Sequence, residues 1–66
     1  MLVEKLANRI KVLREQRGLS QEALAAKAGV SRGYLARLET GRHDPTVGTV
    51  EKLAKALRVK LSELLK

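Results

Sequence analysis

The 66-residue sequence contains no Cys, Trp or Phe, and one each of Pro, Met, Tyr and His. Without Cys, neither disulfides nor a thiolate metal site can stabilise so short a chain. Its stability must come from Leu, Val, Ile and Ala packed between helices, with a partner subunit as a further source of burial. No apolar run approaches the roughly 20 residues that span a membrane, and the charged N-terminal stretch lacks the apolar core of a signal peptide. We expect one cytoplasmic domain over residues 1–66, with no membrane partner.

The same scarcity argues against an enzyme. One His, one Tyr and no Cys leave no nucleophile–base pair, and no pairing of carboxylates favours acid–base chemistry. A Gly-rich loop that would cradle a phosphate is also missing from the sequence. We therefore expect no catalytic residue, no cofactor and no metal ligand.

Positive charge is what the chain has in excess. Fourteen Lys and Arg face seven Asp and Glu, which gives a net charge of +7 on a small surface. Such a field favours a polyanionic partner, although a basic surface also serves solubility alone. A basic membrane-surface helix fits less well, because Gly and Pro divide the chain into short pieces.

The spacing of apolar residues predicts five short helices and no strand. Residues 3–17 carry apolar side chains at steps of three and four, and Gly18 is placed to end that helix. Ser20, Ser31 and Thr46 each precede a further helix as N-cap residues. The expected inward residues of the five helices are, in chain order, Val3, Leu6, Ala7, Ile10 and Leu13; Leu24, Ala25 and Ala28; Leu35 and Leu38; Val50, Leu53, Ala54 and Leu57; and Val59, Leu61, Leu64 and Leu65.

A tight turn joins the second helix to the third. Ala25 is small where two backbones would cross closely, and Gly29 can adopt the positive φ that such a turn needs. Val30 then turns inward, and Leu35 continues the core. This spacing favours a helix-turn-helix, although an ordinary helical hairpin uses similar residues.

Residues 19–65 resemble the phage repressor and Cro type of helix-turn-helix domain. The resemblance is carried by LSQEALAAKAGVS, LARLETGRHDP, VEKLAKAL and SELL. It implies an all-α fold of five short helices, like that of lambda repressor, whose third helix enters the major groove of double-stranded DNA. The groove-facing residues that the resemblance implies are Ser31, Arg32, Gly33, Tyr34 and Arg37, with Arg32 placed for guanine O6 and N7.

A second set is implied to hold the DNA backbone. Its members are Arg14, Gln21, Thr40, Arg42 and His43, with the Gln21 amide donating to a phosphate. The family also pairs Glu39 with an arginine of the first helix, which here is Arg14. If exposed, that pair would contribute only about 0–1 kcal/mol. We expect removal of the Arg14 side chain to weaken DNA binding more than folding.

Three residues depart from the family pattern. Arg58 replaces the usual Gly after the fourth helix, so that turn is either built differently or strained. Lys60 replaces a Ser or Thr cap before the last helix, where a cation opposes the helix dipole. Gly33 removes a side chain from the groove-facing helix, which allows close approach to DNA or marks a position that reads no base.

These features predict a sequence-specific transcriptional regulator, with repression as the expected mode. The alternatives are a protein-interaction module on the same scaffold, such as an antitoxin or a coactivator that holds a regulatory or toxin protein, and a restriction–modification controller. One domain reads few base pairs, so we expect a homodimer on a pseudo-palindrome, with recognition helices about 34 Å apart. Val47, Leu61 and Leu65 are the candidate dimer contacts, with simple core packing as the alternative.

Overall fold

A computed structural model describes the backbone of residues 2–65 and the side chains of residues 4–65. Within this part of the chain all regular structure is helical, as the sequence predicts. The elements are α1 (Leu2–Gln16), α2 (Gln21–Ala28), α3 (Arg32–Glu39), α4 (Val47–Leu57) and α5 (Leu61–Leu64). The first helix thus begins and ends one residue earlier than expected.

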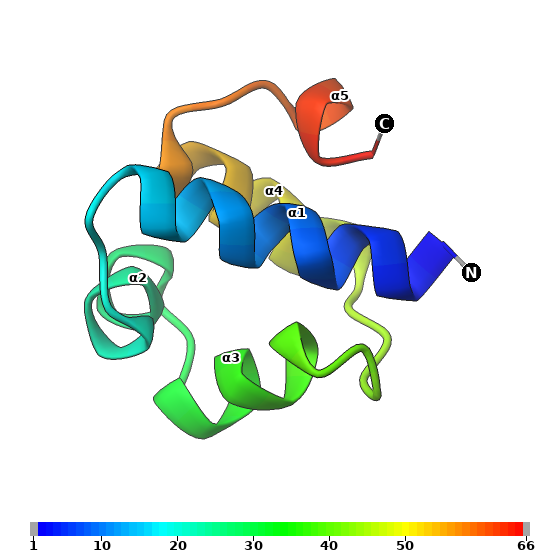
Figure 1. Cartoon of the computed structure of the whole chain (residues 1–66), viewed down its shortest axis with the longest axis horizontal. Helices are drawn as coiled ribbons and strands as arrows, with labels where there is room; N and C mark the ends of the chain where they lie inside the picture. Colours follow the sequence, from blue (N-terminus) through cyan, green and yellow to red (C-terminus); the bar gives the residue numbers. More distant parts are fainter. Residues whose placement is uncertain (1, 66) are drawn as a thin grey trace.

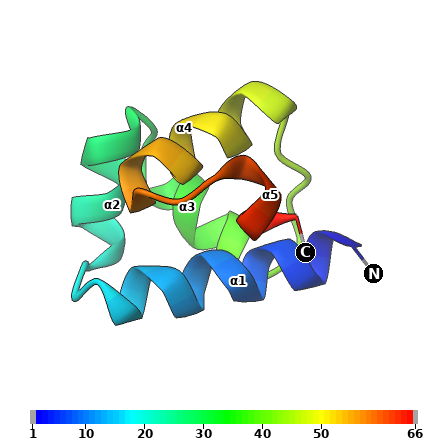
Figure 2. The same ribbon diagram turned by 90° about the horizontal axis from the view of Figure 1, so that it is seen from above.

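The five helices enclose one core. In Figure 1, α3 forms the lower edge of the molecule and α5 the upper edge, and Figure 2 places α1 and α4 on opposite sides. Helix α2 is seen almost end-on in Figure 1 whereas α3 lies across the view, so these two helices cross steeply. Helix α3 packs on α1 and α2, which leaves its other side to solvent.

The inward residues expected from the sequence are buried in most cases. Leu24, Leu35 and Leu53 are fully enclosed, and Ala25 is buried in α2, the helix that crosses α3. Val59 and Leu61 are half-buried against the core, whereas Leu65 is exposed. The side chain of Val3 lies outside the described residues. Leu64, also expected to point inward, is 1% exposed, so spacing located the core and, among the described side chains, overestimated burial only at Val59, Leu61 and Leu65.

The three expected N-caps are confirmed. Ser20, Ser31 and Thr46 have extended backbones, and each side chain accepts a hydrogen bond from the amide three residues later. These bonds satisfy backbone donors that a helix leaves unpaired in its first turn. Gly18 and Gly29 have positive φ, as their places at helix ends require.

The turn from α4 to α5 is strained. Arg58 is left-handed, with φ 59°, and is the one non-glycine residue with positive φ in the described chain. The turn that ends α4 at Arg58 has the same form as one with glycine at this position. The Val59 amide donates to the Ala54 carbonyl at 3.0 Å, as in such a turn. Lys60 then occupies the cap position of α5 without a side-chain cap bond, as its chemistry predicts.

Candidate nucleic-acid interface

Helix α3 presents a polar surface at its beginning. Ser31, Arg32 and Gly33 are exposed, and Arg37 is exposed one turn later, whereas Leu35 and Leu38 point into the core. The Ser31 hydroxyl accepts from the Tyr34 amide at 3.0 Å, which fixes where the helix starts. The core therefore holds one side of α3 and leaves the side with Arg32 and Arg37 exposed to solvent.

The turn before α3 fixes its direction. Gly29 has φ 73°, and the amide of Val30 donates to the Ala25 carbonyl at 3.0 Å. A β-carbon at Gly29 would meet nothing within 4 Å, so the backbone conformation selects glycine, not lack of space. The structure thus contains the helix-turn-helix that the sequence spacing favours.

Glu39, the last residue of α3, receives hydrogen bonds from two other helices. Arg14 donates from Nε to Oε2 at 2.7 Å and from Nη2 to Oε1 at 3.1 Å. Gln21 donates from Nε2 to Oε1 at 3.0 Å. Only 4% of the Glu39 side chain and 11% of the Arg14 side chain are exposed. The stability contribution of about 0–1 kcal/mol that an exposed ion pair makes therefore does not apply to Arg14 and Glu39.

Electrostatics agrees with this geometry. The hydrogen bonds to Glu39 raise the pKa of Arg14 above its ordinary value, and burial opposes this shift with a smaller effect. Arg14 also donates from Nη1 to the Leu19 carbonyl at 2.8 Å, so it is fixed at both ends of its guanidinium. The negative charge of the Glu39 carboxylate is thereby paired with the positive charge of Arg14.

The loop after α3 is tied back to that helix. The Thr40 hydroxyl donates to the Arg37 carbonyl at 2.6 Å and accepts from the Arg42 amide at 3.4 Å. The rings of Tyr34 and His43 meet edge to face, with centroids 4.9 Å apart. Tyr34 is half-buried and packs against the core, so its ring links the loop to the core.

Two groups of predicted site residues make side-chain contacts with one another. Arg14, Gln21 and Glu39 meet at one end of α3, and Tyr34 meets His43 at the loop. The sequence did not predict the bond from Gln21 to Glu39 or the contact between the two rings. The hydrogen bond from Gln21 to Glu39 could have been expected from the chemistry of the carboxylate. Its two oxygens accept more hydrogen bonds than one arginine donates, so a second donor was to be sought.

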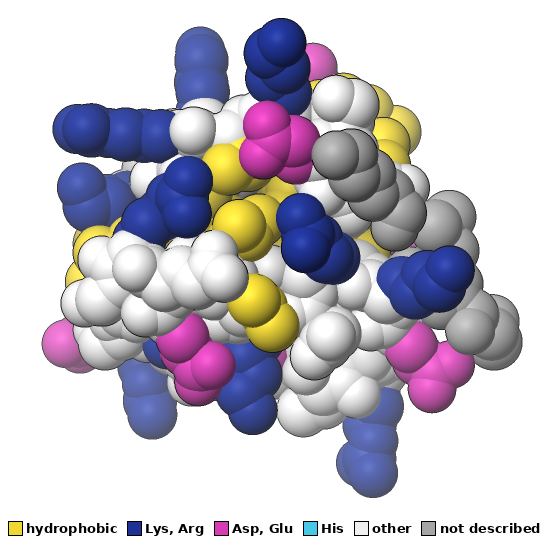
Figure 3. Space-filling view, turned by 45° about the horizontal axis from the view of Figure 1, so that its top comes forward, with side chains coloured by type: hydrophobic (Ala, Val, Ile, Leu, Met, Phe, Trp, Pro, Cys, Tyr) yellow, Lys and Arg dark blue, Asp and Glu magenta, His cyan; other side chains and the backbone are white. Residues whose placement is uncertain are grey.

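Charge alone does not mark this interface. Figure 3 shows Lys and Arg side chains at several points around another face of the molecule, with apolar side chains between them. In the described chain, no three His, Cys, Asp or Glu side chains gather as metal ligands would. None of the helices in residues 2–65 has the length and apolar character needed to cross a membrane. The helix-turn-helix geometry therefore locates the candidate site.

Solved structures share this architecture. The biofilm master regulator SinR, solved in complex with DNA, superposes with a TM-score of 0.88 at 35% identity, over 92% of this chain and 98% of that one. The restriction–modification controller protein C.AhdI from Aeromonas hydrophila gives 0.91 at 37% identity, over 94% of each chain.

Sequence comparison gives the same grouping. The immunity repressor protein of Bacillus phage phi105 is 42% identical over 60 residues, which are 91% of this chain and 42% of the repressor. The chain thus spans less than half the length of that relative. The profile of the helix-turn-helix family HTH_3 matches residues 10–64, which is most of the chain. By this match, and by the geometry of α2, Gly29 and α3, the chain belongs to the HTH_3 helix-turn-helix family.

Proposed function

We propose that this chain binds double-stranded DNA in a sequence-specific manner in the cytoplasm and regulates transcription, with repression as the expected mode. One observation carries the proposal: the exposed, cationic first turn of α3 lies directly after a helix-turn-helix turn. A helix held in this way fits the major groove with its N-terminal residues toward base edges. Similarity to a phage immunity repressor and to a regulator solved on DNA supports the same function.

The roles divide between bases and phosphates. Arg32 is proposed to bind a guanine, and Arg37, one turn later, reaches a base or a phosphate. Ser31, Gly33 and Tyr34 complete the groove-facing side. The proposed phosphate-binding residues are Arg14, Gln21, Thr40, Arg42 and His43. All five helices share one core, which supports treating residues 1–66 as one domain.

Selection of binding sites from random duplex DNA, at two salt concentrations, tests the proposal. Enrichment of one sequence that survives the higher salt is the expected result. Binding that enriches no sequence and vanishes with added salt would mean backbone attraction only, and would contradict sequence-specific regulation.

A homodimer is the second part of the proposal. Val47 is 71% exposed and Leu65 47% exposed, and both line a hollow of about 170 Å³. The rest of its lining is largely apolar and consists of Leu6, Asp44, Pro45, Val50 and Leu61. Asp44 and Pro45 directly follow the proposed phosphate-binding loop. A second copy bound here would bring the DNA-facing loops of both copies close together.

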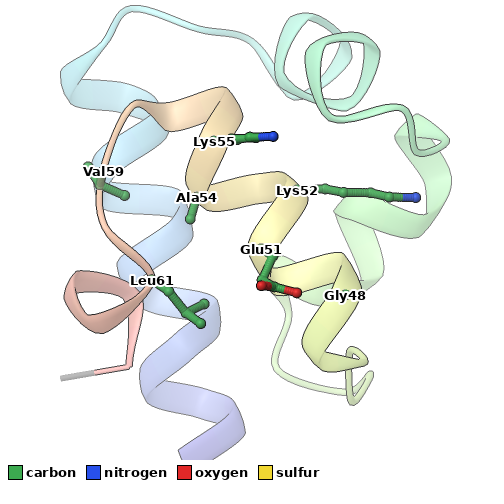
Figure 4. Close-up of a pocket in the computed structure, with 7 residues that line it drawn as sticks. All are labelled: Gly48, Glu51, Lys52, Ala54, Lys55, Val59 and Leu61. Atoms are coloured by element: carbon green, nitrogen blue, oxygen red, sulfur yellow. The ribbon is translucent and has the colours of Figure 1, made fainter.

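A neighbouring hollow supports a two-fold arrangement. It measures about 520 Å³ and shares Leu61 with the first hollow; Figure 4 shows Glu51, Lys52 and Lys55 on α4 around it. A two-fold interface must be complementary to itself. This surface carries both signs of charge, so Glu51 of one copy can pair with a lysine of the other.

A restriction–modification controller is the second candidate function. The controller C.AhdI matches over 94% of its chain, which supports a regulator of that kind. The two candidates share the DNA chemistry and differ in the target gene. A protein-interaction module, such as an antitoxin or coactivator, is the outcome if site selection enriches nothing.

A further inference from the structure

Glu39 lies at the proposed DNA interface, where a free carboxylate would repel the phosphates of DNA. It ends the proposed recognition helix and accepts hydrogen bonds from Arg14 and Gln21, two of the proposed phosphate-binding residues. Its side chain is almost fully buried, so it contacts neither solvent nor an approaching phosphate freely. We infer that Glu39 is a positioning residue, which holds the amide of Gln21 with one N–H toward the DNA backbone. The inference rests on the DNA-binding function proposed above.

The chemistry of the two groups sets the orientation of the amide. A carboxylate only accepts hydrogen bonds, whereas the Gln21 amide has an NH₂ group and a carbonyl oxygen. The NH₂ group must therefore face Glu39, where Nε2 and Oε1 are 3.0 Å apart. A flipped amide would place two oxygens against each other. With one N–H used by Glu39, the second N–H is held in a fixed direction for a phosphate oxygen.

Glu39 acts on Gln21 more than on Arg14. The guanidinium of Arg14 keeps a separate bond to the Leu19 carbonyl at 2.8 Å, so it retains one anchor without the carboxylate. For the Gln21 side chain, Glu39 is the one hydrogen-bond partner that the described part of the chain provides. Loss of the carboxylate therefore releases the amide and leaves the guanidinium partly held.

The sign of one substitution separates positioning from simple charge. Removing a carboxylate near a polyanion lowers repulsion. If Glu39 positioned nothing, the Glu39→Gln protein should therefore bind DNA more tightly than the original protein. If Glu39 positions the Gln21 amide, the Glu39→Gln protein should bind DNA more weakly. The replacement amide also presents a donor to the Nε of Arg14 or the Nε2 of Gln21, so it cannot restore all three bonds.

A double-mutant cycle tests the inference on two duplexes of equal length, one enriched by site selection and one unrelated. Because phosphate contacts carry no sequence information, both duplexes should respond alike. We expect Glu39→Gln to weaken binding about five- to tenfold in the otherwise unchanged protein, and less than about twofold in the Gln21→Met background. Tighter or unchanged binding, or an equal loss in both backgrounds, would overturn the inference.

A DNA-free measurement keeps this test separate from the proposed function. The side-chain NH₂ signals of Gln21 in a ¹H–¹⁵N spectrum should shift, and their hydrogen exchange should accelerate, in Glu39→Gln. Unchanged signals would overturn the inference even if DNA binding fell. Shifted signals in a protein that binds neither duplex would support the contact and contradict the proposed function instead.

Two control variants remove charge and stability as explanations. Glu22→Gln removes an exposed carboxylate from the first turn of α2 and should leave binding unchanged or slightly stronger. Ile10→Ala lowers stability from the buried side of α1, by about 2–5 kcal/mol, which is comparable to the loss of one partner from a buried ion pair, without touching the interface. A loss of binding in Ile10→Ala equal to that in Glu39→Gln would assign the effect to stability and overturn the inference.

Discussion

Arg14 and Glu39, 25 residues apart, join α1 to the last residue of α3 through two hydrogen bonds, of 2.7 and 3.1 Å. Both side chains are largely removed from solvent. A paired arginine and carboxylate in this geometry fix the angle between two planar groups as well as their distance. The contact therefore sets where α3 ends relative to α1.

Arg14→Ala should damage folding as well as DNA binding. It leaves the buried carboxylate of Glu39 without its charged partner, which costs about 3–5 kcal/mol in comparable pairs. We therefore expect a loss of folding at least comparable to the loss of binding, in contrast to the expectation for an exposed pair. Urea unfolding measures the first. An unfolding free energy within about 1 kcal/mol of the original would show that the pair contributes little.

Arg58→Gly should stabilise the protein. Arg58 has φ 59°, a left-handed conformation that costs a residue with a β-carbon roughly 1–2 kcal/mol and costs glycine little. The greater entropy of glycine in the unfolded chain offsets part of this gain, so we expect about 0.5–1 kcal/mol in urea unfolding. Arg58→Ala is the control, since it removes the charge and keeps the strain. Equal stabilisation by both variants would assign the effect to charge repulsion.

Local chemistry explains which parts of the fold were predictable. Ser20, Ser31 and Thr46 cap helices through atoms three residues away, so short sequence patterns suffice to find them. Gly29 is equally local, because its role depends on the backbone angle of one residue. The starts of these helices and the turn of the helix-turn-helix could therefore be predicted from the sequence alone.

The unpredicted contacts depend on packing between distant segments. Gln21 meets Glu39 only because α2 and α3 cross at one angle, and no pattern of spacing encodes which side of an amide faces a carboxylate. The backbone strain at Arg58 is another case. A left-handed backbone at this position favours glycine. The chain keeps that conformation with arginine instead, because α5 packs against α1 and α4.

Gly33→Ala separates the two explanations for a glycine in the recognition helix. A β-carbon at this position would meet nothing within 4 Å, so the free protein should gain up to about 0.5–1 kcal/mol of helix stability. We expect binding to the selected duplex to weaken, because the added methyl group enters the space between helix and groove. Unchanged affinity, measured by titration at fixed salt, would mean that DNA does not approach Gly33 closely.

Arg32→Ala and Arg42→Ala should weaken binding in different ways. Loss of a bidentate contact from Arg32 to guanine should cost about 1–3 kcal/mol on the selected duplex and relax preference at one base pair. Loss of a phosphate contact from Arg42 should weaken all duplexes alike and reduce the slope of log K against log salt by about 0.9. Repeated site selection with each variant checks this. Identical sequence preferences in Arg32→Ala and the original protein would contradict base reading by Arg32.

Val47→Lys should separate dimerisation from folding. Val47 is 71% exposed in one copy, so lysine costs the monomer little, whereas two lysines facing each other across a two-fold interface would repel. We expect sedimentation to show a lower dimer fraction, free or on DNA, and binding to a full pseudo-palindrome to fall further than binding to a half-site. Gln16→Lys, which adds the same charge at an exposed residue outside both hollows, serves as the control. A Val47→Lys protein that dimerises normally would move the interface elsewhere, and a 1:1 complex of the original protein with an asymmetric site would contradict the dimer itself.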